Sequence, residues 1–187
     1  MTQIPNNISI KELLTSLSPS IAREAITSSG ADKELKGTEF SLAVDVSGDI
    51  YSYLVKDGTD FTVKEGDIDA PMVRVRVRRE TLEQMIATQN LDMLLGIQSD
   101  LNKNKYNVLK SLKGSFTAEL ANDDGSVFVI DTIFNNTTDP KATFKMKTTD
   151  SISLIRKETN PVNLFMSGQM KIEGDMAFAM STQPLFS

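Results

Sequence analysis

The sequence predicts an α+β protein, because two kinds of hydrophobic periodicity follow each other along the chain. Apolar residues alternate with polar ones at a period of two in several short segments, which is typical of strands with one buried face. Other segments place apolar residues three or four positions apart between capping residues, which is typical of helices. The 187 residues suffice for one domain of good size or for two small ones in close contact.

The first segment, residues 1–30, is predicted to be helical. Ser9 and Glu12 have the spacing of a capping box, which opens a short helix. Pro19 suits the first position of a second helix, and Gly30 is a typical residue for its end.

Strands and helices alternate from residue 31 onward. Period-two alternation predicts strands at 40–46, 50–55, 60–63, 73–78, 115–121, 127–134 and 142–147. Helices are predicted at 80–89, at 91–97, at 104–112 and after Asp150, which we expect to be an N-cap. Glycine-containing turns at 47–49 and 122–125 predict two hairpins.

The order of these elements suggests an internal repeat. Lys36-Gly37 recurs as Lys113-Gly114, and Gly48 recurs as Gly125 at the same spacing. Side-chain identity between the halves is weak, and recurrence by chance in an α+β chain is the alternative. The repeat divides the chain into the N-terminal helices at 1–30, a first and incomplete half at 31–103, and a second, more complete half at 104–187.

Residues 160–180 hold four of the nine methionines, together with two phenylalanines. Asn160-Pro161 predicts a helix start, Gly168 its end, and Gly174-Asp175 the start of a last helix after a short strand. Methionine fills irregular apolar space and adapts to varied partners. The stretch therefore fits either a soft core or the wall of a pocket for an apolar ligand.

The order and spacing of this stretch resemble a known family. The pattern Asn-Pro-x-Asn-x-Phe-Met-x-Gly-x-Met-Lys-Ile-x-Gly-Asp-Met-Ala-x-Ala-Met, from Asn160 to Met180, is similar to the C-terminal signature of the sterol carrier protein-2 family. The resemblance lies mainly in residues 113–182. It implies an antiparallel-rich mixed sheet covered on one face by helices, with a hydrophobic tunnel for sterols, fatty acyl chains or other lipids between the two layers.

The resemblance also implies where the ligand would lie, because this region borders the tunnel in the family. The expected ligand-binding residues from the signature are Phe165, Met166, Met170, Ile172, Met176 and Met180. The sheet and the preceding helix are expected to add Phe128, Ile130, Phe144, Met146 and Leu154. The first half lacks the signature, so the site is expected in the second half.

Two absences restrict the chemistry of the chain. It contains no cysteine and no histidine, and therefore no thiolate nucleophile, no zinc ligand of the Cys/His type and no imidazole base. It has no glycine-rich phosphate loop or dinucleotide fingerprint, and its Asp-Gly turns lack the ligand spacing of an EF-hand. We therefore expect no enzymatic activity, no metal and no cofactor.

The charges argue against a nucleic-acid partner, because the net charge is −5. One strand and its exit nevertheless carry a basic stripe, and the second half has lysines in similar places. The residues concerned are Arg74, Arg76, Arg78, Arg79, Lys145 and Lys147. They fit a docking patch for acidic lipid head groups or a partner, or a solvated sheet face paired with acidic neighbours. The second interpretation is favoured, since no aromatic residues interleave with the arginines.

The sequence also leads to an expected compartment and an expected function for the chain. The first residues do not have the form of a secretory signal, and Leu185-Phe186-Ser187 is not a peroxisomal address, so cytoplasmic residence is expected. The function expected is non-catalytic binding or transfer of a fatty acyl chain, a sterol or an isoprenoid in a Met/Phe-lined cavity, with transient membrane contact as a further expectation. The alternative is a protein-interaction or scaffold module with a closed core that uses a sheet edge or the basic stripe.

Overall fold

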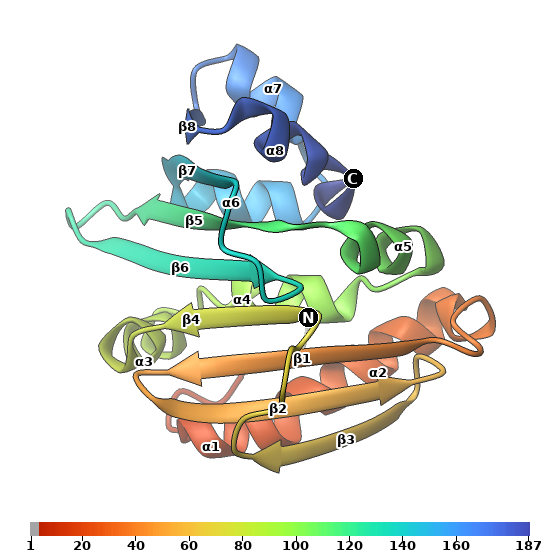
Figure 1. Ribbon diagram of the computed structural model, residues 1–187. Coiled ribbons are helices and arrows are strands. Elements are labelled where there is room, and N and C mark those ends of the chain that lie inside the picture. Colours follow the sequence, from red (N-terminus) through yellow and green to blue (C-terminus); the bar gives the residue numbers. More distant parts are fainter. Residues whose placement is uncertain (1–3) are drawn as a thin grey trace.

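Eight strands form one sheet in a computed structural model of the chain, which describes residues 4–187 apart from the side chain of Ile97 (Figure 1). The predicted α+β fold is confirmed. The strands are β1 (Glu39–Val46), β2 (Asp49–Lys56), β3 (Asp60–Glu65), β4 (Val73–Val77), β5 (Gly114–Ala121), β6 (Val127–Phe134), β7 (Lys141–Lys147) and β8 (Lys171–Gly174).

Side chains cap the starts of four helices, at Ser9, Asn102, Asn160 and Asp175. The helices are α1 (Ile10–Glu12), α2 (Ser18–Ser29), α3 (Arg79–Ala87), α4 (Asp92–Ser99), α5 (Lys103–Ser111), α6 (Thr148–Ile155), α7 (Pro161–Met166) and α8 (Met176–Ser181). A π-helical segment, Leu13–Leu17, joins α1 to α2, and short 3-10 helices lie at Ala31–Lys33 and Gln183–Phe186.

The strand order is β3-β2-β1-β4-β6-β5-β7-β8, so the two predicted halves share one sheet. In each half an antiparallel hairpin, β1–β2 or β5–β6, precedes a strand that pairs in parallel with the first strand of the hairpin. The antiparallel pair β4–β6 joins the halves. Order and pairing therefore agree between them, while an internal repeat and the division of the chain at residues 31 and 104 remain predictions.

Helices cover one face of the sheet. In Figure 1 α2, α4 and α6 lie behind the strands, and the opposite face is turned to the reader. The alternation along β4 shows the consequence, because Val73, Val75 and Val77 are buried whereas Arg76 is exposed on the open side. An antiparallel-rich mixed sheet with one covered face is the architecture that the resemblance implied.

Two local predictions about helix starts were wrong. Asp150 is not an N-cap, because the chain leaves β7 in an extended conformation at Lys147 and α6 begins directly at Thr148. Pro19 does not restart a separate helix, because the π-helical segment carries the helix on without a break. A π-helical turn changes the partners of local carbonyl groups, and here the carbonyl oxygen of Leu14 accepts a hydrogen bond from the Tyr53 hydroxyl.

Candidate functional site

The signature stretch folds into a helix, an edge strand and a second helix, as its capping residues predicted. Asn160 caps α7, since its side-chain oxygen accepts a hydrogen bond from the Asn163 backbone N–H at 2.9 Å. Pro161 occupies the first turn, where its missing N–H costs nothing. Gly168 then turns the chain with a φ of 77° and directs it back toward the sheet.

The strand β8 places α8 over the sheet, and Gly174 makes this possible. Gly174 lies opposite Ala142 in the antiparallel pair β7–β8 and has a φ of 89°. A Cβ atom on this residue would lie 2.5 Å from the carbonyl oxygen of Lys141. Asp175 follows and caps α8 by accepting a hydrogen bond from the Phe178 backbone N–H at 2.7 Å. Only glycine therefore permits this close approach of the two strands before the chain turns into α8.

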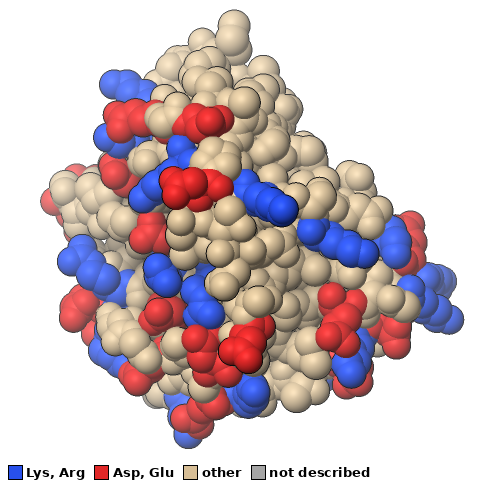
Figure 2. Space-filling view, in the orientation of Figure 1, with Lys and Arg blue, Asp and Glu red and all other residues tan. Residues whose placement is uncertain are grey.

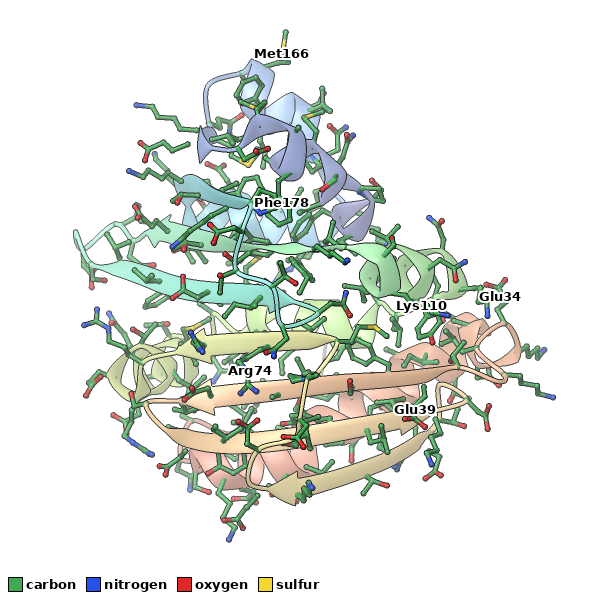
Figure 3. All side chains as sticks on the ribbon, viewed as in Figure 1. Glu34, Glu39, Arg74, Lys110, Met166 and Phe178 are labelled. Carbon is green, nitrogen blue, oxygen red and sulfur yellow. The ribbon has the colours of Figure 1, made fainter. Side chains whose placement is uncertain are left out.

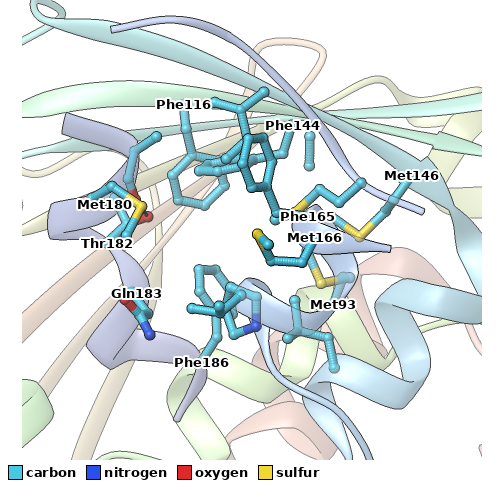
Figure 4. A pocket seen from close by; sticks show the side chains of 17 residues that line it. Met93, Phe116, Phe144, Met146, Phe165, Met166, Met180, Thr182, Gln183 and Phe186 are labelled. Carbon is cyan, nitrogen blue, oxygen red and sulfur yellow. Dashed lines mark hydrogen bonds between the residues drawn. The ribbon is translucent and has the colours of Figure 1, made fainter. Parts of the chain in front are cut away.

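These elements enclose an apolar cavity of about 270 Å³ between the sheet and the helices (Figure 4). It lies among β5, β7, β8, α6, α7 and α8. Its wall consists of Met93, Phe116, Ala118, Phe144, Met146, Leu154, Pro161, Val162, Phe165, Met166, Met170, Ile172, Ala179, Met180, Thr182, Gln183 and Phe186. None of these described lining residues is charged, so the cavity suits an apolar occupant.

Aromatic rings form one side of the cavity around Phe116. The Phe116 and Phe144 rings meet nearly edge-on, with their centroids 5.4 Å apart and their planes at 76°. Phe186 packs on Phe116 from the C-terminal 3-10 helix, with centroids 6.2 Å apart. Such tilted pairs stabilise one another beyond the area that they bury, and they give this side of the cavity a fixed shape.

Two polar side chains lie at the end of the cavity near the C-terminus. The Thr182 hydroxyl donates a hydrogen bond to the Ala179 carbonyl oxygen at 2.7 Å and is therefore satisfied at the C-terminal end of α8. The Gln183 side-chain amide has no hydrogen-bond partner among residues 4–187. It is therefore the lining group that offers a free donor and acceptor to a ligand.

The structure brings eight of the predicted ligand-binding residues together around this cavity. These are Phe144, Met146, Leu154, Phe165, Met166, Met170, Ile172 and Met180. Their role in binding remains a prediction.

Three predicted residues do not line the cavity. Phe128 and Ile130 face the helices from β6, which lies on the far side of β5 from β7 and β8. Met176 is the first residue of α8, and 43% of its surface is exposed.

The sequence did not predict the other lining residues as part of the site, although the alternation of Phe116 and Ala118 predicted that they are buried. Phe116 and Ala118 lie on the inward face of a predicted strand, and nothing in the local pattern distinguishes cavity wall from packed core. Among the described residues, Met93 on α4 is the one lining residue from the first half. Gln183 and Phe186 follow the signature in a short 3-10 helix, whose return over the cavity depends on tertiary packing.

Four of the six residues of the basic stripe pair with acidic neighbours (Figures 2 and 3). Arg74 donates to Asp67 at 2.9 Å, and this guanidinium lowers the pKa of the Asp67 carboxyl below its ordinary value. Lys145 lies 3.0 Å from Glu173, and this carboxylate raises the pKa of Lys145. Further pairs are Arg76–Asp45 and Arg79–Asp49. A face with alternating charges of this kind is typical of a solvated sheet surface.

Within residues 4–187 no helix is long and apolar enough to cross a bilayer. The same residues contain no group of three or more acidic, cysteine or histidine side chains placed to hold a metal ion.

Several solved structures are similar to this chain at low identity. A sterol carrier protein domain 2 of Helicoverpa armigera is 21% identical, with 54% of this chain and 84% of that chain covered and a TM-score of 0.40. A sterol carrier protein 2 from Yarrowia lipolytica, in its apo form, is 10% identical, with 95% and 93% covered and a TM-score of 0.24. A UbiJ-SCP2 ubiquinone synthesis protein is 11% identical, with 95% and 92% covered and a TM-score of 0.31. At these values the likeness says nothing about ligands.

No curated protein matches the chain significantly. The profile of the SCP-2 sterol transfer family matches residues 97–187, which include every described cavity-lining residue except Met93. The resemblance of this part of the chain to the sterol carrier protein-2 family is therefore confirmed.

Proposed function

We propose that the chain binds a hydrophobic ligand in the apolar cavity and carries or transfers it without chemical change. The observation that carries the proposal is the lining, in which Gln183 and Thr182 are the only polar side chains among the described residues. The match of residues 97–187 to a sterol transfer family supports lipids in general as the ligand class.

Burial of apolar surface supplies enough free energy for such binding. Each methylene group taken from water into the cavity contributes about 0.8 kcal/mol. Eight methylene groups contribute roughly 6 kcal/mol before the entropic losses of binding are subtracted. A chain ligand therefore needs no charged anchor in the cavity.

The size and polarity of the cavity narrow the ligand class. A volume of about 270 Å³ is near the lower limit for small-molecule pockets, which span about 300–1,000 Å³. This favours a fatty acyl or isoprenoid chain, which enters by one end, over a rigid sterol, which has to enter whole. An uncharged head group can hydrogen-bond the Gln183 amide, whereas a free carboxylate would stay in water at the mouth.

The proposal includes non-catalytic action in the cytoplasm. Asp, Glu, Lys, Tyr, Ser and Thr remain available for chemistry in the chain, but none of the charged types lines the described cavity. Binding alone is therefore the simplest function that this lining supports.

The test combines native extraction with titration. The purified full chain is extracted and its lipids are identified by mass spectrometry, and the delipidated chain is titrated with a fluorescent fatty acid. Copurified lipid and saturable one-site binding are expected. An empty extract together with no saturable binding would contradict the proposal.

A further inference from the structure

Exposed apolar side chains gather at one end of the molecule. Six large hydrophobic residues are exposed among residues 4–187, and five of them belong to α7 and α8. These five form what we term the α7–α8 patch: Val162, Phe165, Met166, Met176 and Met180. Met166 is the most exposed, at 78%, and Figure 3 shows it at the outer tip of this end of the molecule. Clustered exposed hydrophobic residues indicate an interaction surface, whereas scattered ones do not.

The patch is continuous with the wall of the cavity. Val162, Phe165, Met166 and Met180 line the cavity and are also exposed to solvent. Met176 extends the patch by one helical turn from Met180, because residues four positions apart share a helix face. A ligand that leaves the cavity past these side chains meets apolar surface throughout.

The elements that carry the patch are free of charge. Residues 161–170 and 176–187 contain no Asp, Glu, Lys or Arg. Figure 2 shows the same end of the molecule, above the paired charges of the open face, as a largely uncharged surface. Lys171, Glu173 and Asp175 lie between the two segments, so an apolar medium that covers α7 and α8 desolvates no charged side chain of these helices themselves.

We infer that the α7–α8 patch docks the chain on the surface of a lipid bilayer, with uncharged lipids sufficient for binding. Methionine, valine and phenylalanine make up the patch, which lacks the Trp, Tyr and Arg side chains in which protein–protein hot spots are enriched. A protruding tip with flexible methionine side chains suits insertion among acyl chains, which conform to any shape. The inference rests on the proposed function and names its partner, because a lipid carrier has to exchange its ligand with a membrane.

The variant Met176→Glu tests the docking surface without altering the cavity. Met176 belongs to the patch but does not line the cavity, and it is 43% exposed. Val127→Glu is the matched control, because Val127 is 46% exposed and lies on β6, outside the patch. The full chain and both variants are floated with neutral phosphatidylcholine vesicles. Wild type and Val127→Glu are expected to bind, and Met176→Glu is expected to bind at least about tenfold more weakly.

Titration of the same three proteins with a fluorescent fatty acid, in the absence of vesicles, separates this inference from the proposed function. Met176→Glu is expected to keep the wild-type dissociation constant. If the wild type binds vesicles but no fatty acid, the proposed function is wrong and the docking surface stands.

Four results would overturn the inference. The first two are absence of vesicle binding by the wild type and an equal loss of vesicle binding in Met176→Glu and Val127→Glu. The third is vesicle binding that requires anionic lipid and disappears in salt. The fourth is a wild-type dimer that Met176→Glu dissociates. The last result would assign the patch to a second copy of the chain.

Discussion

Met180 lines the apolar cavity, whereas Met176, one helical turn earlier on α8, lies outside it with 43% of its surface exposed. Both methionines belong to the signature stretch, and their spacing puts them on one helix face. Met180 therefore faces both the cavity and the solvent, with 49% of its surface exposed, and Met176 continues this apolar surface away from the cavity. This arrangement joins a binding site to an apolar outer surface through a single short element.

Gly174→Ala is expected to destabilise the fold strongly. The new Cβ atom would lie 2.5 Å from the Lys141 carbonyl oxygen, at a residue whose φ is 89°. Strain and clash together should lower the free energy of unfolding by about 3 kcal/mol.

Gly168→Ala is the matched control for Gly174→Ala. Its φ is 77°, but a Cβ atom would meet nothing within 4 Å. It should therefore cost about 1 kcal/mol, from backbone conformation alone. Urea unfolding of both variants measures the difference, and equal losses would refute the close packing of β7 against Gly174.

Tyr53 should make the fold sensitive to alkaline pH. Burial raises the pKa of the Tyr53 hydroxyl well above its ordinary value of about 10. Above about pH 10 the unfolded chain releases this proton while the folded chain keeps it. The stability from Tyr53 is therefore full below about pH 10 and is lost as the pH rises toward the folded-state pKa.

Tyr53→Phe tests this pH dependence. At pH 7 it should lower the free energy of unfolding by about 1 kcal/mol, because the Leu14 carbonyl oxygen loses its donor. Thermal melting at pH 7 and at pH 11 should show a smaller alkaline loss for Tyr53→Phe than for wild type. An alkaline loss of the same size in both proteins would exclude Tyr53 as its source.

Asp100 is expected to stabilise the fold mainly by neutralising the buried ammonium group of Lys105. It pairs with Lys105, whose side chain is only 7% exposed, and with Lys157 at 3.1 Å. Asp100→Asn leaves a buried ammonium group without its counter-charge and should lower the free energy of unfolding by about 3 kcal/mol. Lys105→Met removes the charge and keeps the apolar stem, so it should cost less. Urea unfolding ranks the two variants, and the reverse order would contradict the pairing argument.

Local patterns predicted the elements because their causes are local. The alternation in residues 73–77, the caps at Asn160 and Asp175 and the turn at Gly125 each act within a few residues, and each element appears where expected. Asp150 failed as a cap because the end of β7, a tertiary feature, fixes where α6 begins.

The cavity was predictable in part. Its methionine-rich wall was expected from the resemblance of the signature. Phe128 and Ile130 share the inward face of the sheet, but they lie on β6, one strand further from β7 and β8 than β5, and do not reach the cavity. Their distance depends on strand order, which no local pattern specifies. Met93 reaches the cavity from α4, which packs against α6, and this helix–helix contact is likewise not specified by a local pattern.

The central claim is that an accessible apolar cavity binds the ligand, and Ala118→Phe tests it most directly. Ala118 lies on the wall from β5 and is 1% exposed, so a phenyl ring at this position would fill the empty volume. Ala25→Phe adds the same ring in a separate groove between α2 and α4 and serves as the control.

The measurement is the dissociation constant for a fluorescent fatty acid, with the melting temperature of each variant recorded alongside. Ala118→Phe is expected to raise the dissociation constant at least about tenfold while its melting temperature does not fall, and Ala25→Phe is expected to bind as wild type. Unchanged binding by a folded Ala118→Phe variant would contradict the account.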